Sequence, residues 1–298
     1  MIDLHIHTNH SDGSDDVISI LKKAEAKKLK VISITDHDTC SAYQELEQLN
    51  VREFFNGNII IGVELKTHIN GYKIELLGLN VDYKYINNEV NKYYLPQKEK
   101  RKIEKERLLK ICNDLGVKLD TVFNDEYNPY EEYAGSYIYK HIIKHEENKR
   151  FFKNRQFPEC FYNFYREHLS NPDSVFYVDL LDIIPDINTI IKLIKESGGL
   201  VFIPHPFIYK ENSMNILKSL INNYKIDGIE CYYHNHTDEE IAFLVNLCQK
   251  NNLLVSGGSD YHGISRPNVK LGVIQKNKSI PFEIIQNWYD KNKILFPK

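Results

Sequence analysis

The chain has 298 residues, of which 42% are hydrophobic and 27% are charged, a balance typical of a globular protein. Its net charge of −3 gives no overall basic surface, so we do not expect it to bind long duplex nucleic acid. No apolar stretch approaches the roughly 20 residues that span a bilayer, and we expect no signal peptide before the first strand. Five scattered cysteines without a Cys-x-x-Cys pair indicate reduced thiols. We therefore expect a cytoplasmic protein without a membrane partner, and leave its oligomeric state open.

Residues 1–94 alternate between strand-like and helix-like segments. Asp15 or Asp16 can cap the first helix, whose apolar residues recur at helical spacing. We predict strands at 2–7, 31–35, 59–64 and 73–81, and helices at 16–29 and 40–50.

Residues 186–298 return to the same alternation. Asp186 can cap a helix that Gly198-Gly199 ends. Strands separated by helices are typical of parallel βα units, which indicates an α/β fold. The further predicted strands are 200–204, 227–231, 253–257 and 269–274, and the further predicted helices are 213–224, 238–251 and 282–292.

Residues 95–185 lack this alternation, and we interpret them as an α-helical insertion between two parts of one α/β domain, 1–94 and 186–298. A charged helix is predicted over 97–115 and ends at Gly116. Another begins near Ser136, and an aromatic helical segment spans about 157–169. The tyrosines can form the core of the insertion, or serve as a lid that stacks a nucleobase or excludes water. They are Tyr127, Tyr130, Tyr133, Tyr137 and Tyr139.

Histidine and carboxylate side chains stand where the strand-like segments end. His5-x-His7 closes the first segment, and residues two apart on a strand point to the same face. Neutral imidazole is a common ligand of divalent transition metals. In barrels of alternating strands and helices, active sites lie at the carboxyl ends of the strands, so we expect these residues to converge. The others are His37, Glu64, His205, Glu230, Asp260 and His262.

Five sequence motifs contain these residues. They are His5-x-His7 with Asp12-Gly13, Ile34-Thr35-Asp36-His37-Asp38-Thr39, Gly62-Val63-Glu64, Ile203-Pro204-His205-Pro206, and Gly258-Ser259-Asp260-Tyr261-His262-Gly263. In order and spacing, over almost the whole chain, these motifs resemble the PHP (polymerase and histidinol phosphatase) family. The resemblance implies a distorted (β/α)7 barrel, similar to a TIM barrel, with two or three divalent metal ions at the strand ends.

The resemblance also implies a distribution of ligands among the metals. Imidazole and carboxylate ligands together suit Mn, Fe or Zn better than Ca or Mg. The first metal would be held by His5, His7, Glu64 and Asp260, the second by Asp12, His37 and His262, and the third by Glu64 and His205.

One position departs from the family pattern. The segment Lys73-Ile74-Glu75-Leu76-Leu77-Gly78 carries Glu75 where family members usually have a histidine. A carboxylate can still bind a metal and would make the site more negative and harder; alternatively, the third metal is weaker or absent. His68 lies too far from the motif to replace that histidine, and we interpret it as a surface residue.

The motifs and the resemblance predict an enzyme, a metal-dependent phosphoesterase in which metal-activated water attacks phosphorus. The expected substrate is a small nucleotide, a short oligonucleotide or a cyclic phosphate. One alternative is a histidinol-phosphate-type phosphomonoesterase, and another is a non-catalytic, metal-bound interaction module. A hydrolase of C–N bonds on a similar barrel is less favoured, because such enzymes commonly include a bridging lysine and no lysine stands at a suitable strand end.

The predicted catalytic residues are Asp12, His37, His205 and Arg107. Arg107 on the charged helix and Arg266 after the last motif are cationic candidates for holding the phosphate. Lys100, Arg101 and Lys105 can extend a basic face, although a solvated helix face is the simpler interpretation.

Several residues near the motifs have more than one interpretation. Asp36 or Asp38 can fix the tautomer of His37, although a turn role suits Asp38 better. Glu230 is interpreted as a residue that supports the site or the fold rather than as a ligand. His10 and the segment from Tyr232 to His236 lie either near the substrate or on surface loops.

Overall fold

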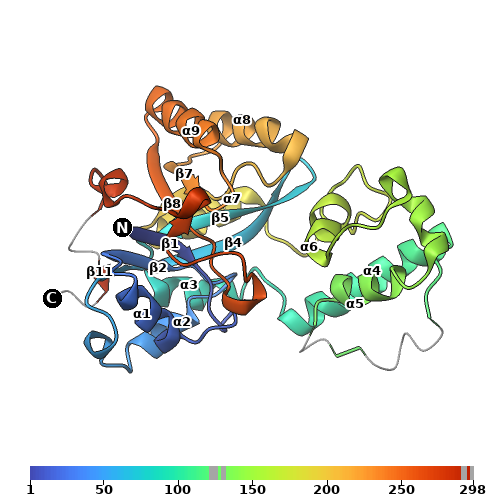
Figure 1. Ribbon diagram of the computed structural model, residues 1–298, viewed down its shortest axis with the longest axis horizontal. Helices are drawn as coiled ribbons and strands as arrows, with labels where there is room; N and C mark the ends of the chain where they lie inside the picture. The colour runs from blue at the N-terminus through green and yellow to red at the C-terminus, as the bar shows by residue number, and fades with distance from the viewer. Residues whose placement is uncertain (121–126, 129–131, 290–293, 296–298) are drawn as a thin grey trace. The chain divides into compact units, whose positions relative to one another are not determined.

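The computed structural model describes residues 1–120, 127–128, 132–289 and 294–295, and the chain forms two compact units (Figure 1). The first unit comprises 1–67, 75–90 and 187–298, and the second comprises 68–74 and 91–186. The predicted insertion, 95–185, falls inside the second unit. This unit also includes residues 68–74, which form the tip of a hairpin. The role of the unit as a lid or substrate domain stays a prediction. Among the described residues, no helix is long and apolar enough to cross a membrane.

Two sheets form the centre of the first unit. The strand order is β1-β2-β3-β11 in one sheet and β4-β5-β6-β7-β8 in the other. The first sheet has β1 (Ile2–Ile6), β2 (Val31–Ile34), β3 (Asn58–Ile60) and β11 (Ile294–Leu295). The second has β4 (Gly62–Ile69), β5 (Tyr72–Leu79), β6 (Leu200–Ile203), β7 (Gly228–Tyr233) and β8 (Leu254–Gly258). A separate pair is formed by β9 (Val273–Ile274) and β10 (Lys278–Ser279).

Helices of the first unit pack against these strands. Every residue of β1 and of β2 is buried, which is typical of parallel strands covered on both faces. The helix α7 packs against β6, and α9 packs against β7 and β8. The helices are α1 (Val17–Ala26), α2 (Ser41–Leu46), α3 (Tyr83–Val90), α7 (Ile187–Glu196), α8 (Ser213–Asn223) and α9 (Asp238–Asn251). Short 3-10 helices occur at Val51–Glu53, Lys210–Asn212, Gly263–Ser265, Gln275–Asn277 and Phe282–Ile285.

The strand directions confirm the mixed α/β fold but depart from the prediction at one strand. The strands β1, β2 and β3 are parallel, and so are β6, β7 and β8. In contrast, β5 is antiparallel to β6. Only Asn70 and Gly71 separate β4 from β5, which is too short a connection for the crossover helix that a parallel βα unit would need. A closed barrel is not confirmed: in the described residues, the two sheets are connected by isolated bridges, among them Ile6 to Tyr261 and His37 to Glu64.

Most predicted elements are confirmed within a few residues, and the exceptions lie where local signals are weak. Asp16 rather than Asp15 caps α1, and its side chain accepts a hydrogen bond from Ser19 N at 2.7 Å. The sequence did not reveal α3 or the break between β3 and β4. The strand predicted over 269–274 is confined to β9, and the helix predicted over 282–292 is a 3-10 helix that ends at Ile285; residues 290–293 lie outside the described residues.

The second unit is helical and has its own apolar core. Its helices are α4 (Gln97–Leu115), α5 (Ala134–Ile142) and α6 (Phe161–Phe164), with 3-10 segments at Glu146–Phe151 and Lys153–Arg155 and a π-helical turn at Tyr165–Leu169. Gly116 ends α4 with φ of 67°, as predicted. The buried Tyr137 and Tyr139 belong to the core of this unit, which confirms the core interpretation for them. Tyr133 lies against the Arg101 guanidinium, and Tyr130 is outside the described residues.

Gly258 lets the carboxyl end of β8 approach β1 closely. A Cβ at this position would lie 2.2 Å from His5 Cβ and 2.6 Å from His5 N. Just beyond it, Asp260 N donates to His5 O at 2.9 Å, and His7 N donates to Tyr261 O at 2.9 Å. The buried Asp3 carboxylate accepts hydrogen bonds from both the backbone and the hydroxyl of Ser259. These contacts hold residues 3–7 beside residues 258–262.

We predict that Gly258→Ala lowers the free energy of unfolding by about 3 kcal/mol, the upper end for overpacking, because the new methyl group would meet the backbone and the Cβ of His5, which cannot move aside as a flexible side-chain end can. Urea denaturation measures this loss. Gly198→Ala is the matched control: nothing lies within 4 Å of its Cβ, so it costs only the backbone strain of φ at +76°, about 1 kcal/mol. Equal losses in the two variants would contradict the close-approach argument.

Candidate metal centre

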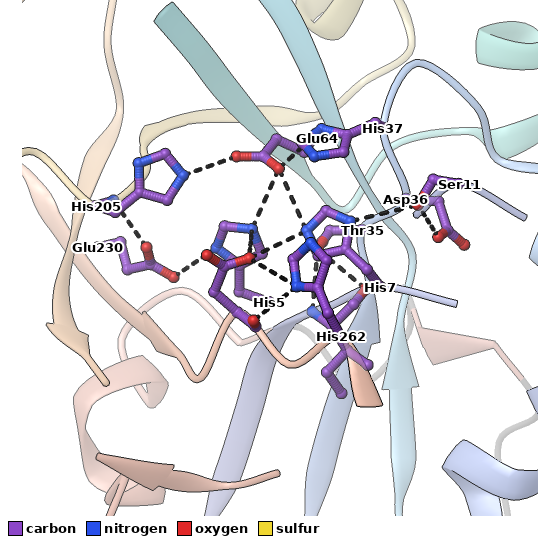
Figure 2. A network of polar contacts seen from close by, with 12 residues as sticks. His5, His7, Ser11, Thr35, Asp36, His37, Glu64, His205, Glu230 and His262 are labelled. Atoms are coloured by element: carbon purple, nitrogen blue, oxygen red, sulfur yellow. Dashed lines mark hydrogen bonds and ion pairs between the residues drawn. The ribbon is translucent and has the colours of Figure 1, made fainter. Parts of the chain in front are cut away.

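Five imidazoles gather near one buried carboxylate, that of Glu64 on β4 (Figure 2). Glu64 Oε1 lies 3.0 Å from His205 Nε2. Its Oε2 lies 3.1 Å from His37 Nδ1, 3.3 Å from His7 Nε2 and 3.4 Å from His5 Nε2. The imidazoles are those of His5, His7, His37, His205 and His262. They come from β1 and from the segments that follow β1, β2, β6 and β8, so the sequence-predicted strand ends do converge.

The nine residues predicted as metal ligands are those that the structure brings together. Among the described residues there are four groups in which histidine and carboxylate ligand atoms all lie within 4.8 Å of one another. They are His7-Asp12-His37-His262, His5-His205-Asp260, His5-His7-Glu64 and Glu64-Glu75-His205. Bonds of about 2.0–2.2 Å place the ligands of one ion within roughly 4.4 Å of each other, so small side-chain adjustments would close these groups around metal ions.

The buried ring nitrogens support this fit. Five of them form no hydrogen bond within the described part of the chain, although carboxylate oxygens lie close to most of them. A buried polar atom without a hydrogen bond is costly, so such atoms in one place indicate a missing partner. The atoms are His5 Nε2, His7 Nε2, His37 Nδ1, His205 Nδ1 and His262 Nε2. Imidazole nitrogens and carboxylate oxygens are ligands of Zn, Fe and Mn.

Glu230 on β7 fixes two of the candidate ligands at once. Its Oε1 lies 2.9 Å from His5 Nδ1, and its Oε2 accepts a hydrogen bond from His205 N at 2.8 Å (Figure 2). With its Nδ1 donating to a carboxylate, the His5 ring presents Nε2 toward Glu64 and Asp260. This geometry agrees with the interpretation of Glu230 as a supporting residue.

Asp260 is held from behind by two side chains. The Tyr233 hydroxyl donates to Asp260 Oδ2 at 3.0 Å, and Arg266 Nη1 donates to the same oxygen. The other oxygen, Oδ1, then faces His5 and His7 at 3.5 and 3.3 Å. Tyr233 reaches Asp260 because a bulge in β7, between Glu230 and Tyr232, places residues three apart toward the same site.

The loop that carries Asp12 is anchored by Asp36. Asp36 Oδ1 accepts hydrogen bonds from Thr8 N at 2.8 Å and from Ser11 Oγ at 2.5 Å. Asp12 Oδ1 thereby comes within 3.2 Å of His262 Nε2. Asp36 thus fixes the loop. Within the described residues, it accepts no hydrogen bond from the His37 ring. Asp38 adopts φ of 55° and accepts a hydrogen bond from Lys66 N at 2.9 Å, which agrees with the predicted turn role.

The electrostatics of the centre favour ionised carboxylates. Burial alone would raise the pKa of Glu64, but the neighbouring His5 and His37 outweigh it and hold that pKa well below its usual range. Burial likewise opposes ionisation of Asp260, yet Arg266 and His5 lower its pKa. For His7, burial is outweighed by the nearby carboxylates of Asp260 and Glu64, which raise its pKa to about 9. The carboxylates therefore attract positive charge, which divalent ions would supply in place of protons.

Other candidates from the sequence have different partners. Arg107, in the second unit, forms a two-pronged pair with Asp182, with Nη1–Oδ1 at 2.6 Å and Nη2–Oδ2 at 2.7 Å, so its phosphate contact stays a prediction. Arg266 Nη1 donates to Asp260, and the phosphate contact predicted for Arg266 likewise stays a prediction. His10 Nε2 pairs with Glu45 at 2.8 Å. Lys100, Arg101 and Lys105 lie against tyrosine rings of the second unit, and His68, which also belongs to that unit, is half-buried.

Of the two interpretations of the segment from Tyr232 to His236, a surface loop does not fit its two buried residues. Tyr233 and His236 are buried, and His236 Nδ1 donates to Cys231 O at 3.0 Å. Tyr233 is the last residue of β7, and strict alternation from Glu230 would point it away from the site, so no local sequence signal reveals its role.

The chain matches one family model and is similar to two proteins of known name over most of its length. A family model described as the PHP domain matches residues 3–157. The phosphoribosyl 1,2-cyclic phosphate 1,2-diphosphodiesterase of Eggerthella lenta is 24% identical over 263 residues, which cover 88% of this chain and 94% of that protein. The 5′-3′ exoribonuclease of Haemophilus influenzae is 26% identical over 265 residues, which cover 87% of this chain and 89% of that protein.

Two solved structures share the fold. An amidohydrolase from Chromobacterium violaceum has a TM-score of 0.68 at 18% identity, with 100% of this chain and 98% of that one covered. A protein from Bifidobacterium adolescentis, assigned as a metal-dependent phosphoesterase, has a TM-score of 0.62 at 17% identity, with 96% and 94% covered. At these identities the likeness concerns the fold alone.

We predict that Glu230→Gln lowers the affinity for Mn²⁺ by 10- to 100-fold, the usual cost of losing the carboxylate partner of a metal-binding histidine. The glutamine amide has a single acceptor oxygen, so it can accept the hydrogen bond from His5 Nδ1 or the one from His205 N, but not both. Calorimetric titration of the metal-free protein measures the change. The exposed Glu239 on α9 provides the matched control, Glu239→Gln, and an affinity lowered equally in both variants would contradict the role of Glu230.

Proposed function

Because the chain belongs to the PHP domain family, we infer that it is a metal-dependent hydrolase of phosphoric ester bonds. The observation that carries this inference is the convergence of His5, His7 and seven further ligand residues, with five buried ring nitrogens that lack hydrogen bonds. Burying so many polar groups without hydrogen-bond partners costs free energy, and the fold alone does not require it.

We further propose that the bond hydrolysed is a phosphodiester in a short oligonucleotide or a cyclic phosphate of a small nucleotide-like molecule. Two relatives support this choice. They are named as a cyclic phosphate diphosphodiesterase and an exoribonuclease, and each name describes the opening of a diester link. Both alignments extend over more than four fifths of the chain.

The residues of the chain have separate tasks in this proposal. The four ligand groups would hold two or three divalent ions of the Mn, Fe or Zn type. Bound ions of this kind lower the pKa of water and neutralise phosphate oxygens. Glu230 and Tyr233 keep His5 and Asp260 in place, so that the ligand atoms need little rearrangement.

The predicted catalytic residues keep their proposed roles on this basis. Asp12, His37 and His205 contribute atoms to the ligand groups and therefore lie where the phosphate would be held. Arg107 can contact a phosphate only if the substrate takes the place of Asp182 at its guanidinium. A guanidinium accepts carboxylate and phosphate with the same two-pronged geometry, which makes such an exchange chemically reasonable.

We expect the Mn-loaded protein to convert the dinucleotide pApA to AMP. In His7→Ala this activity should fall by more than about 100-fold, because losing a ligand itself should cost more than losing a residue that only supports a ligand. Chromatographic product analysis distinguishes the outcomes. Release of inorganic phosphate with ApA left intact would show a monoesterase and contradict the diester proposal.

The matched control is His10→Ala, because His10 pairs with Glu45 and belongs to none of the ligand groups. This variant should hydrolyse pApA at a rate close to that of the unmodified protein. Chelation should abolish activity, and renewed addition of Mn²⁺ should restore it in His10→Ala but not in His7→Ala. Full activity of His7→Ala would overturn the metal assignment.

A further inference from the structure

Two of the four ligand groups share no residue and differ in donor chemistry. The group of His7, Asp12, His37 and His262 offers three imidazoles and one carboxylate. The group of Glu64, Glu75 and His205 offers two carboxylates and one imidazole. The groups also differ in the number of protein ligands, which is four in the first and three in the second. One centre thus contains a nitrogen-rich and an oxygen-rich site.

The oxygen-rich group is a built feature of the second sheet. Glu64 lies on β4 and Glu75 on the adjacent strand β5, and their side chains are almost fully buried, at 1% and 6% exposure. His205 follows β6 and is 3% exposed. Bulk water does not screen these carboxylates effectively, so the donor atoms themselves decide which ion is held.

The two donor sets favour different ions. Imidazole is a good ligand for Zn and Fe, whereas carboxylates and water suit Mn and Mg. Four protein ligands complete the tetrahedral shell of Zn²⁺. Three ligands that are mostly oxygen leave positions for water on a six-coordinate ion.

We propose that the centre holds two kinds of metal at once, Zn²⁺ or Fe²⁺ in the His7-Asp12-His37-His262 group and Mn²⁺ in the Glu64-Glu75-His205 group. The inference rests on the proposed metal dependence of the protein. Glu75 determines the preference for Mn²⁺. Without it the group would have one carboxylate, from Glu64, and one imidazole, from His205; with it, carboxylates predominate. Zn²⁺ binds more tightly than Mn²⁺ to most sites, but the difference in affinity is larger at sites whose ligand atoms are mostly nitrogen. Limited Zn²⁺ therefore fills the nitrogen-rich group first and leaves the other to Mn²⁺.

The test is a competition between metals followed by elemental analysis. Metal-free protein is equilibrated with about one equivalent of Zn²⁺ and an excess of Mn²⁺, desalted and analysed for both metals, with the spin resonance of bound Mn²⁺ as a second readout. The unmodified protein should retain Zn and Mn together. Glu75→His should lose most of the Mn and bind a second Zn when more Zn²⁺ is supplied. Glu75→Gln, which removes the charge without adding an imidazole, should lose Mn and gain no Zn.

The matched control is Glu239→His, which adds the same imidazole at an exposed position of α9 and should leave the retained metals unchanged. Retention of a single kind of metal by the unmodified protein, or the same Mn content in Glu75→His, would overturn the proposal. If Glu75→His does not fold, Glu75→Gln still decides. These readouts require no substrate, so mixed metal loading without pApA hydrolysis would contradict the proposed function and leave this inference intact.

Discussion

The burial of the Glu64 carboxylate among imidazoles is the constraint on which the rest of the structure depends. Removing a carboxylate from water is costly unless positive charge and hydrogen bonds replace the lost hydration. Within the described part of the chain, the ring of His205 is hydrogen-bonded to this carboxylate, while the rings of His5, His7 and His37 face it without a hydrogen bond. Divalent cations would satisfy the carboxylate and the imidazoles together, which is why the arrangement indicates a metal centre rather than a set of salt bridges.

The fold holds these groups in place despite the free-energy cost of burying them together. Gly258 permits the contact between β1 and the end of β8, and Asp3 ties Ser259 to the same place. The strand β7 supplies no residue to the four ligand groups, yet through Glu230 and Tyr233 it fixes ligands that belong to three other segments. Positions held by buried hydrogen bonds need little rearrangement when an ion binds, and this preorganisation favours both affinity and catalysis.

The candidate ligand residues could be named from the sequence because each lies in a short local motif of the PHP family. Alternation along β1 places His5 near its end, and Gly116 marks the end of α4 by its need for a positive φ. The supporting contacts were out of reach, since Glu230 is 225 residues from His5 and Tyr233 turns inward only through a bulge. The direction of β5 and the short 3-10 helix at Phe282–Ile285 were also missed, because hairpin pairing and tertiary packing override local periodicity there.

The most direct test of the metal centre is anomalous diffraction from crystals of the protein grown with Mn²⁺ and Zn²⁺, with data collected at the absorption edges of both metals. The account predicts anomalous peaks between the ring nitrogens of His5, His7, His37 and His262 and the carboxylates of Glu64 and Asp260. Absence of peaks there, with the five imidazoles hydrogen-bonded to ordered water instead, would contradict it.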